Sequence, residues 1–183
     1  MSERFLGNYV DGGFVFPSGG RVFGSENPWT GESVLTALES PDIVPNAVAA
    51  ASRALPAWRR RTMAERLAIL DGLRTALPRH ADRIAEAITA EMGKPRGEAL
   101  IEARGIAQKL ADTAALFSHE LAAAHPNAPG EQRHHALGVV GIIGPFNFPV
   151  HLINTHLLPT LLAGNTVVCK PSDLTPLAGQ RYA

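Results

Sequence analysis

The sequence predicts an α/β fold built on an incomplete parallel sheet, of which it contains the first βαβ unit. Two short β-branched runs, Val139–Ile143 and Thr166–Cys169, have the composition of strands that are buried on both faces. The apolar stretch Phe148–Ala163 lies between them and is long enough for a helix. Parallel strands need a crossover of a dozen or more residues, and this stretch provides it.

A β-rich arm is predicted for residues 1–41, ahead of the βαβ unit. Its strands are expected within Phe5–Phe16, within Arg21–Asn27 and over Ser33–Leu38. The triplets Asp11-Gly12-Gly13 and Ser18-Gly19-Gly20 indicate turns within and after the first of these ranges.

Residues 42–121 are predicted to be helical. Thr62-Met63-Ala64-Glu65 is a capping box, in which the threonine and glutamate side chains satisfy free N–H groups at a helix start. One face of that helix is expected to carry Ile84, Ile88 and Met92. Gly93 with Pro95 ends it and begins the next helix.

Residues 122–183 are predicted to hold the βαβ part, with Ala122–Gly130 as a linker and Gln132–Leu137 as an extended segment. Gly144-Pro145 closes the first strand, and Gly164-Asn165 supplies a helix stop that tolerates the left-handed conformation. The predicted crossover helix contains residues at helical spacing, namely Leu152, His156, Pro159 and Ala163.

Two polar residues follow the ends of the predicted strands, where ligands collect in parallel sheets. Asn147 lies just past the first strand and Lys170 just past the second. The Lys170 ammonium would emerge at this edge, where it could bond ribose hydroxyls or a cofactor phosphate.

Several motifs in the chain resemble the aldehyde dehydrogenase superfamily. GPFNFP, followed by LLAGNTVV and KPSDLTP, carries the resemblance, and HLINTHLLP is similar more narrowly to succinylglutamate semialdehyde dehydrogenases of arginine catabolism. Upstream, Ala57-Trp58, Glu91–Pro95 and Glu98–Glu102 follow the same family pattern. The resemblance implies a Rossmann-like sheet, and it covers the amino-terminal third or so of a family enzyme.

The resemblance also implies roles for single residues. Asn147 would donate its amide N–H to the oxyanion that forms when a thiolate attacks an aldehyde. The alternative is that Asn147 only makes an Asx-turn ahead of Phe148-Pro149. Lys170 and Asp173 would bind the adenosine ribose. The alternative is that both residues simply lie in a solvated turn after the strand. The other cofactor-binding positions implied by the family are Ile143, Gly144, Pro145 and Ser172.

The implied cofactor is NAD, with NADP left open because Asp173 stands where the family usually has the longer glutamate. The implied partners are a small aldehyde substrate and further copies of the intact enzyme in a homo-oligomer.

Other chemistry-bearing residues favour structural interpretations. Cys169 is expected in the core, without a neighbour that would lower its pKa. His151 and His156 are five residues apart, so they diverge on a helix and predict no metal site. They could face an aldehyde tunnel by resemblance, or serve as polar helix contacts. Glu91 and Lys94 are expected to cap and flank the Gly93 turn.

Composition favours a water-soluble protein of the cytoplasm. The 183 residues carry no net charge and have a pI near 7.1, which indicates neither a nucleic-acid partner nor an anionic membrane surface. A single cysteine excludes an internal disulfide. We expect no targeting segment and no membrane span from the hydrophobic pattern.

The family's catalytic cysteine, general base and pyrophosphate turn have no counterpart in these residues. We therefore expect this chain alone to be inactive as an enzyme. Two alternatives to an enzyme part are a non-catalytic interaction fragment and a truncation product without a role. Pro176–Ala183 begins like a helix, with Thr175 as N-cap, but is short. From this we expect a chain that is partly unfolded or associated in solution.

Overall fold

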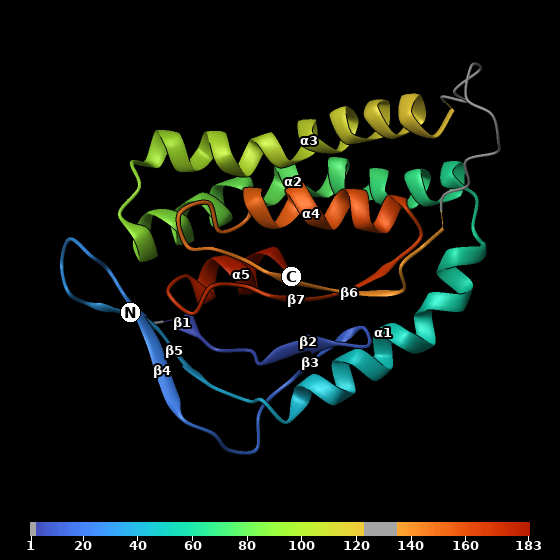
Figure 1. Cartoon of the computed structure of the whole chain (residues 1–183). Coiled ribbons are helices and arrows are strands. Elements are labelled where there is room, and N and C mark those ends of the chain that lie inside the picture. The colour runs from blue at the N-terminus through green and yellow to red at the C-terminus, as the bar shows by residue number, and fades with distance from the viewer. Residues whose placement is uncertain (1–2, 123–134) are drawn as a thin grey trace.

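The computed structural model describes residues 3–122 and 135–183. Figure 1 shows its elements, and the strands are β1 (Glu3–Arg4), β2 (Asn8–Val10), β3 (Gly13–Val15), β4 (Val22–Glu26), β5 (Ser33–Leu38), β6 (Val139–Ile143) and β7 (Thr166–Lys170). The helices are α1 (Ile43–Arg60), α2 (Met63–Met92), α3 (Arg96–Ala122), α4 (His151–Leu162) and α5 (Pro176–Tyr182). Apart from Ala122, the expected linker Ala122–Gly130 lies outside the described residues. The first three residues of the expected extended segment Gln132–Leu137 also lie outside them.

The amino-terminal arm forms two small sheets. β1, β5 and β4 make one sheet in that order, and β2 pairs with β3 in an antiparallel hairpin. The hairpin turn consists of Asp11 and Gly12, both at positive φ, which is the backbone that closes a two-residue hairpin. The three strand regions expected in the arm are confirmed, with narrower bounds in the first two.

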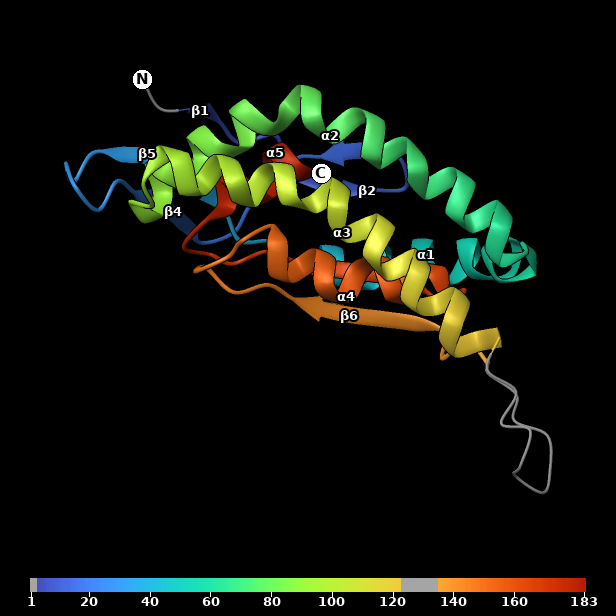
Figure 2. The same cartoon turned by 90° about the horizontal axis from the view of Figure 1, so that it is seen from above.

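Three helices follow the arm, and the long α2 and α3 pack side by side (Figure 2). The capping box at the start of α2 is confirmed, because Thr62 Oγ1 accepts from the Glu65 N–H at 3.2 Å and Glu65 Oε2 accepts from the Thr62 N–H at 2.6 Å. Ile84 and Ile88 lie in the main hydrophobic core, with Met92 packed against it. Gly93 ends α2 with a φ of 72°, as expected of a left-handed cap.

The βαβ unit is present as predicted, with β6 and β7 parallel and α4 between them in the chain. Helix α4 starts at His151, three residues later than expected, because residues 146–150 form bends and a turn. Leu152, His156 and Pro159 lie on this helix with Ala163 as its C-cap, and the buried positions of the helix are Ile153, Asn154, Leu158 and Leu162. This helix is apolar on most sides, so periodicity could not identify its inner face.

The expectation that β6 is buried on both faces is also wrong. α4 lies above the β6–β7 pair and α1 below it in Figure 1, and both contact the two strands. Nevertheless Ile143 is 80% exposed, and Gly141 is exposed as well. Within the described residues β6 has a single neighbouring strand, so its outer edge and part of its surface are not covered.

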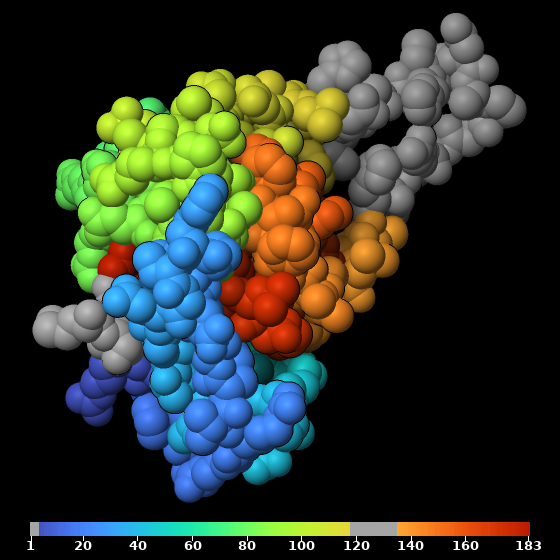
Figure 3. All heavy atoms as spheres, turned by 90° about the vertical axis from the view of Figure 1, so that its left-hand side faces the viewer, coloured from blue at the N-terminus to red at the C-terminus, as the bar shows by residue number. Residues whose placement is uncertain are grey.

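Helix α5 is only seven residues long, and tertiary contacts hold it in place. The buried Glu91 carboxylate accepts from the Leu177 N–H at 2.7 Å and from the Ala178 N–H at 2.8 Å. It also accepts from the Ser25 hydroxyl at 2.6 Å. Glu91 thus joins the arm, α2 and α5, and the expectation that it caps the Gly93 turn is wrong. In Figure 3 the arm (blue) accordingly lies against both the green helices and the red carboxyl-terminal segment.

Thr175 precedes α5 as expected, but its hydroxyl does not cap the helix. The Thr175 Oγ1 atom is buried and has no hydrogen-bond partner within the described part of the chain. The capping function falls to Glu91 because a carboxylate near a helix N-terminus satisfies free N–H groups and complements the helix dipole.

Burial raises the pKa of Glu91 above its ordinary value of 4.5, although the hydrogen bonds from Ser25, Leu177 and Ala178 oppose this shift. The folded chain therefore holds this proton to higher pH than the unfolded chain does. As pH rises from about 4.5 through the folded pKa, ionisation of Glu91 should lower the stability of the unaltered chain relative to Glu91→Gln. Above the folded pKa the difference should become constant.

This expectation can be measured by urea unfolding of both proteins at several pH values between about 4 and 8. Glu98→Gln, at an exposed position of α3, is the matched control. A relative stability of the unaltered chain that rises with pH over this window would contradict the argument.

Candidate functional site

The carboxyl ends of β6 and β7 form one edge of the parallel pair. The strands run in register, with Ile143 opposite Lys170, and the Gly144 N–H donates to the Lys170 carbonyl at 2.8 Å. All the predicted site residues lie at or just beyond this edge: Ile143, Gly144, Pro145 and Asn147 at β6, and Lys170, Ser172 and Asp173 at β7.

Gly144 is required by the close approach of α4 to the strand end. A Cβ atom at this position would lie 2.6 Å from side-chain carbons of Ile153. Since Ile153 is fully buried, it has little room to move. The absence of a side chain at Gly144 therefore lets α4 pack directly behind the edge.

Asn147 is exposed, and its side-chain amide makes no hydrogen bond to the residues that the structure describes. An Asx-turn would need the N–H of the residue two positions on, and that residue is Pro149, which has none. The structural alternative for Asn147 therefore fails on chemical grounds. Its amide is available to a ligand.

The backbone at Asn147 is held by a residue from the connection between α2 and α3. Lys94 Nζ donates to the Asn147 carbonyl at 3.1 Å and lies 3.8 Å from the centre of the Phe148 ring. The Lys94 ammonium also pairs with the Glu102 carboxylate at 2.5 Å, and the two side chains are 8% and 2% exposed. The expectation that Lys94 merely flanks the Gly93 turn is wrong, because its charge points into the interior.

Glu102, from α3, satisfies the start of α4. Its Oε1 atom accepts from the Val150 N–H at 3.4 Å and from the His151 N–H at 3.3 Å. Val150 is the N-cap residue of α4 and provides no side-chain cap of its own. The carboxylate therefore takes over the capping of α4 from a different helix.

Sequence reasoning missed both Lys94 and Glu102 as parts of this edge. The signal that could have found them was the family-like pattern of Glu91–Pro95 and Glu98–Glu102. Charged residues of such a pattern are candidates for a buried pair when apolar residues surround them. Only the packing of α3 on α4 shows which segment the pair contacts.

On the β7 side, Lys170 and Asp173 are exposed. Lys170 Nζ donates to the Pro171 carbonyl at 3.0 Å and lies 3.8 Å from the Asp173 carboxylate, with side-chain exposures of 63% and 75%. Such an exposed pair is weak, so a ligand could separate it. The donor and the acceptor stand together at a strand end, which suits a vicinal diol such as that of a ribose.

Ser172 and Ile143 differ in what they could offer a ligand. Ser172 is buried, and its hydroxyl oxygen accepts from the Leu174 N–H at 3.2 Å, so it shapes the turn after β7. Ile143, 80% exposed, presents an apolar side chain at the end of β6.

The two histidines of α4 are not brought together. His151 is half-buried with its ring 6.2 Å from that of Phe148, whereas His156 is exposed. Among the described residues, no three His, Cys, Asp or Glu side chains are grouped so that they could hold a metal ion.

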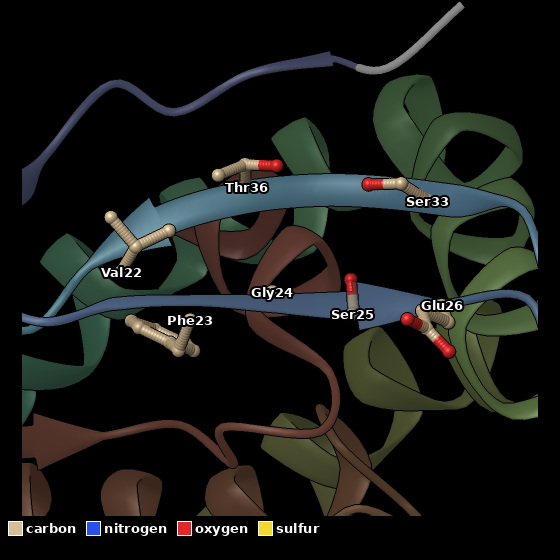
Figure 4. Close-up of a pocket in the computed structure, with 7 residues that line it drawn as sticks. All are labelled: Val22, Phe23, Gly24, Ser25, Glu26, Ser33 and Thr36. Carbon is tan, nitrogen blue, oxygen red and sulfur yellow. The ribbon is translucent and has the colours of Figure 1, made fainter.

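A shallow hollow of about 290 Å³ lies elsewhere, on the β4–β5 strands of the arm (Figure 4). It is lined by Val22, Phe23, Gly24, Ser25, Glu26, Ser33 and Thr36. None of the predicted site residues contributes to it, and its Ser25 hydroxyl is already bonded to Glu91.

Comparison with known proteins gives the family. The aldehyde dehydrogenase family model matches residues 14–183. The chain belongs to the aldehyde dehydrogenase family. It is 42% identical over 178 residues to N-succinylglutamate 5-semialdehyde dehydrogenase 2 of Caulobacter vibrioides, covering 95% of this chain and 36% of that protein. The corresponding enzyme of Pseudomonas fluorescens is 40% identical over 166 residues, covering 86% and 33%. The chain therefore spans about a third of the length of these relatives.

Solved structures share the fold of this aldehyde dehydrogenase family member. Aldehyde dehydrogenase from Bartonella henselae matches with a TM-score of 0.88 at 25% identity, covering 98% of this chain and 39% of that one. An NADP-dependent glyceraldehyde-3-phosphate dehydrogenase of Bacillus halodurans, complexed with NADP, matches at 0.81 and 27%, covering 94% and 39%. An NAD-dependent benzaldehyde dehydrogenase of Corynebacterium glutamicum matches at 0.78 and 27%, covering 93% and 38%.

The helices of the described residues include none that is both long and apolar enough to cross a membrane.

Cys169 is half-buried in β7, and burial raises its pKa to about 11. At pH 8 roughly one thiol in a thousand would be ionised, so Cys169 is a poor nucleophile.

We expect the rate at which iodoacetamide alkylates Cys169 to increase with pH up to about pH 11, because only the thiolate reacts. Because the chain has one cysteine, the label reports this site alone. A small cysteine peptide, whose thiol has a pKa of about 8.5, is the control. If the alkylation rate of the chain reached half its maximum near that same pH, the raised pKa of Cys169 would be contradicted.

Proposed function

We propose that this chain is the amino-terminal part of an NAD(P)-dependent aldehyde dehydrogenase that oxidises an aldehyde to a carboxylic acid. N-succinylglutamate 5-semialdehyde is the proposed substrate, because relatives named for this activity share about 40% of their residues with the chain. The protein would be cytoplasmic and homo-oligomeric when intact, with neither nucleic acid nor membrane as a partner.

The observation that carries the proposal is the state of Asn147. Its amide is exposed beyond the end of β6, while its backbone carbonyl is bonded to a buried lysine. When a thiolate attacks an aldehyde, negative charge develops on the carbonyl oxygen. An N–H donor held in place by the surrounding structure stabilises that charge without having to reorganise, which contributes about 3–4 kcal/mol.

The residues at the end of β7 fit the adenosine ribose of a dinucleotide. Lys170 would donate to a ribose hydroxyl and Asp173 would accept from one. A cofactor bound there would accept the hydride at its nicotinamide ring. Asp173 has a short side chain, and this leaves the choice between NAD and NADP to experiment.

Cys169 does not supply the nucleophile in this proposal. Its thiol is half-buried with a pKa raised to about 11, and it lies within the strand rather than at the exposed edge. The proposed chemistry therefore needs a cysteine from another part of the full-length protein, and this chain by itself should not oxidise aldehydes.

The test uses a full-length chimera, in which this chain replaces the matching third of the Caulobacter relative. Asn147→Ala in the chimera should lower kcat by roughly 10²–10³ with little change in KM, because the bond to the oxyanion forms chiefly in the transition state. Asn46→Ala, at an exposed asparagine of α1, is the control and should keep full activity. An effect on KM alone would show that Asn147 does not stabilise the charge of the transition state.

Cofactor binding is tested in the same chimera. Lys170→Ala should raise the cofactor dissociation constant by up to about 100-fold, as expected for loss of a charge-assisted hydrogen bond, and should leave aldehyde preference unchanged. Lys109→Ala on α3 is the matched control. Unchanged cofactor affinity in a titration of the Lys170 variant would remove this lysine from the proposed site.

A further inference from the structure

The segment from Asn147 to His151 is held by two side chains that come from much earlier in the sequence. Lys94 donates to the Asn147 carbonyl, at 3.1 Å. Glu102 accepts from the amides of Val150 and His151, at 3.4 and 3.3 Å. These three bonds fix the chain immediately after Asn147, whereas pairing of β6 with β7 fixes it before.

Lys94 and Glu102 form an ion pair that is shielded from water. Their side chains are 8% and 2% exposed, and the charged atoms lie 2.5 Å apart. The Phe148 ring covers the ammonium at 3.8 Å. The ion pair between Arg74 and Asp71 on α2 is different, since both side chains are about half exposed and the two residues are three positions apart on one helix. A surface pair of that kind is weak, but a buried pair with all its partners in place is rigid.

The further hydrogen-bond partners of this pair show whether it only braces the α2–α3 corner or also holds another segment. A pair that served only to brace the corner between α2 and α3 would need no contact with another segment. Here the carboxylate uses one oxygen for Lys94 and the other for the start of α4, and the ammonium bonds the carbonyl of Asn147 itself. The pair therefore acts on the segment that carries the exposed amide.

We propose that Lys94 and Glu102 are positioning residues for Asn147, which hold its backbone so that the side-chain amide keeps one place beyond the end of β6. This inference rests on the proposed oxyanion role of Asn147. It extends that role by assigning a function to two residues that are not among the proposed aldehyde- and cofactor-binding residues.

Amide hydrogen exchange of the 183-residue chain, followed by NMR, tests the structural part. The decisive variant is Lys94→Met with Glu102→Leu, which removes both charges together and so leaves no unpaired charge in the interior. The Val150 and His151 amides should be protected in the unaltered chain and should exchange at least about tenfold faster in the double variant. The amides of Ile84 and Ile88 should keep their protection and report on the stability of the core.

Glu91→Gln is the matched control, since Glu91 is another buried carboxylate that accepts from two helix amides. It should change exchange at Leu177 and Ala178 and leave Val150 and His151 unaffected. Unprotected Val150 and His151 amides in the unaltered chain would overturn the proposal, and so would protection that survives in the double variant.

The functional part is tested in the chimera with the Caulobacter relative. The double variant should lower kcat by roughly 10- to 100-fold with KM nearly unchanged, because a small displacement of a catalytic group is costly. In an Asn147→Ala background the same double change should cause no further loss, since its effect acts through Asn147.

The outcomes separate this inference from the proposed function. If the chimera is inactive, or Asn147→Ala leaves kcat unchanged, the proposed function fails while the exchange data still decide whether the pair holds the segment. If Asn147→Ala lowers kcat and the double variant does not, the positioning role is overturned. Losses that add fully in the combined variant would overturn it as well.

Discussion

The Lys94 ammonium and the Glu102 carboxylate lie 2.5 Å apart in the interior, and the edge of the parallel pair depends on them. Removing two charges from water is costly, and such a pair persists only when further bonds satisfy both groups. Here the Asn147 carbonyl, the Phe148 ring and two amides of α4 provide those bonds. Loss of one partner would leave a buried charge at a cost of about 3–5 kcal/mol, so the sequence is strongly constrained at both positions.

Glu91 repeats the same physical solution on the other side of the Gly93 turn. Neither α4 nor α5 has a side-chain cap of its own, and each has its first amides bonded by a buried glutamate from the α2–α3 region. Gln180 of α5 in turn bonds the Leu6 amide and the Arg4 carbonyl of the arm, at 2.7 and 3.1 Å. The arm, the helical segment and the βαβ unit are thereby joined through polar contacts as well as through the hydrophobic core.

Local signals predicted much of this fold. The capping box at Thr62, the end of α2 at Gly93 and the two β-branched strands all depend on residues within a few positions of one another, and all are found as expected. The start of α4 was misplaced by three residues for a physical reason. Phe148 and Pro149 extend the apolar run into the turn, and the helix begins only where Glu102, 49 residues away from His151, bonds the first amides.

The sequence by itself determined the order of strands and helices, the aldehyde dehydrogenase family and the residues at the ends of the two parallel strands, because short-range patterns and motifs encode these features. Tertiary structure alone decided that Asn147 is anchored through its carbonyl, that Cys169 has a raised pKa, and that Glu91 and Glu102 act as helix caps. The two glutamates bond partners that are 48 to 87 residues away in the sequence, and the pKa of Cys169 depends on its burial. Neither a distance in space nor the dielectric environment can be read from spacing along a chain.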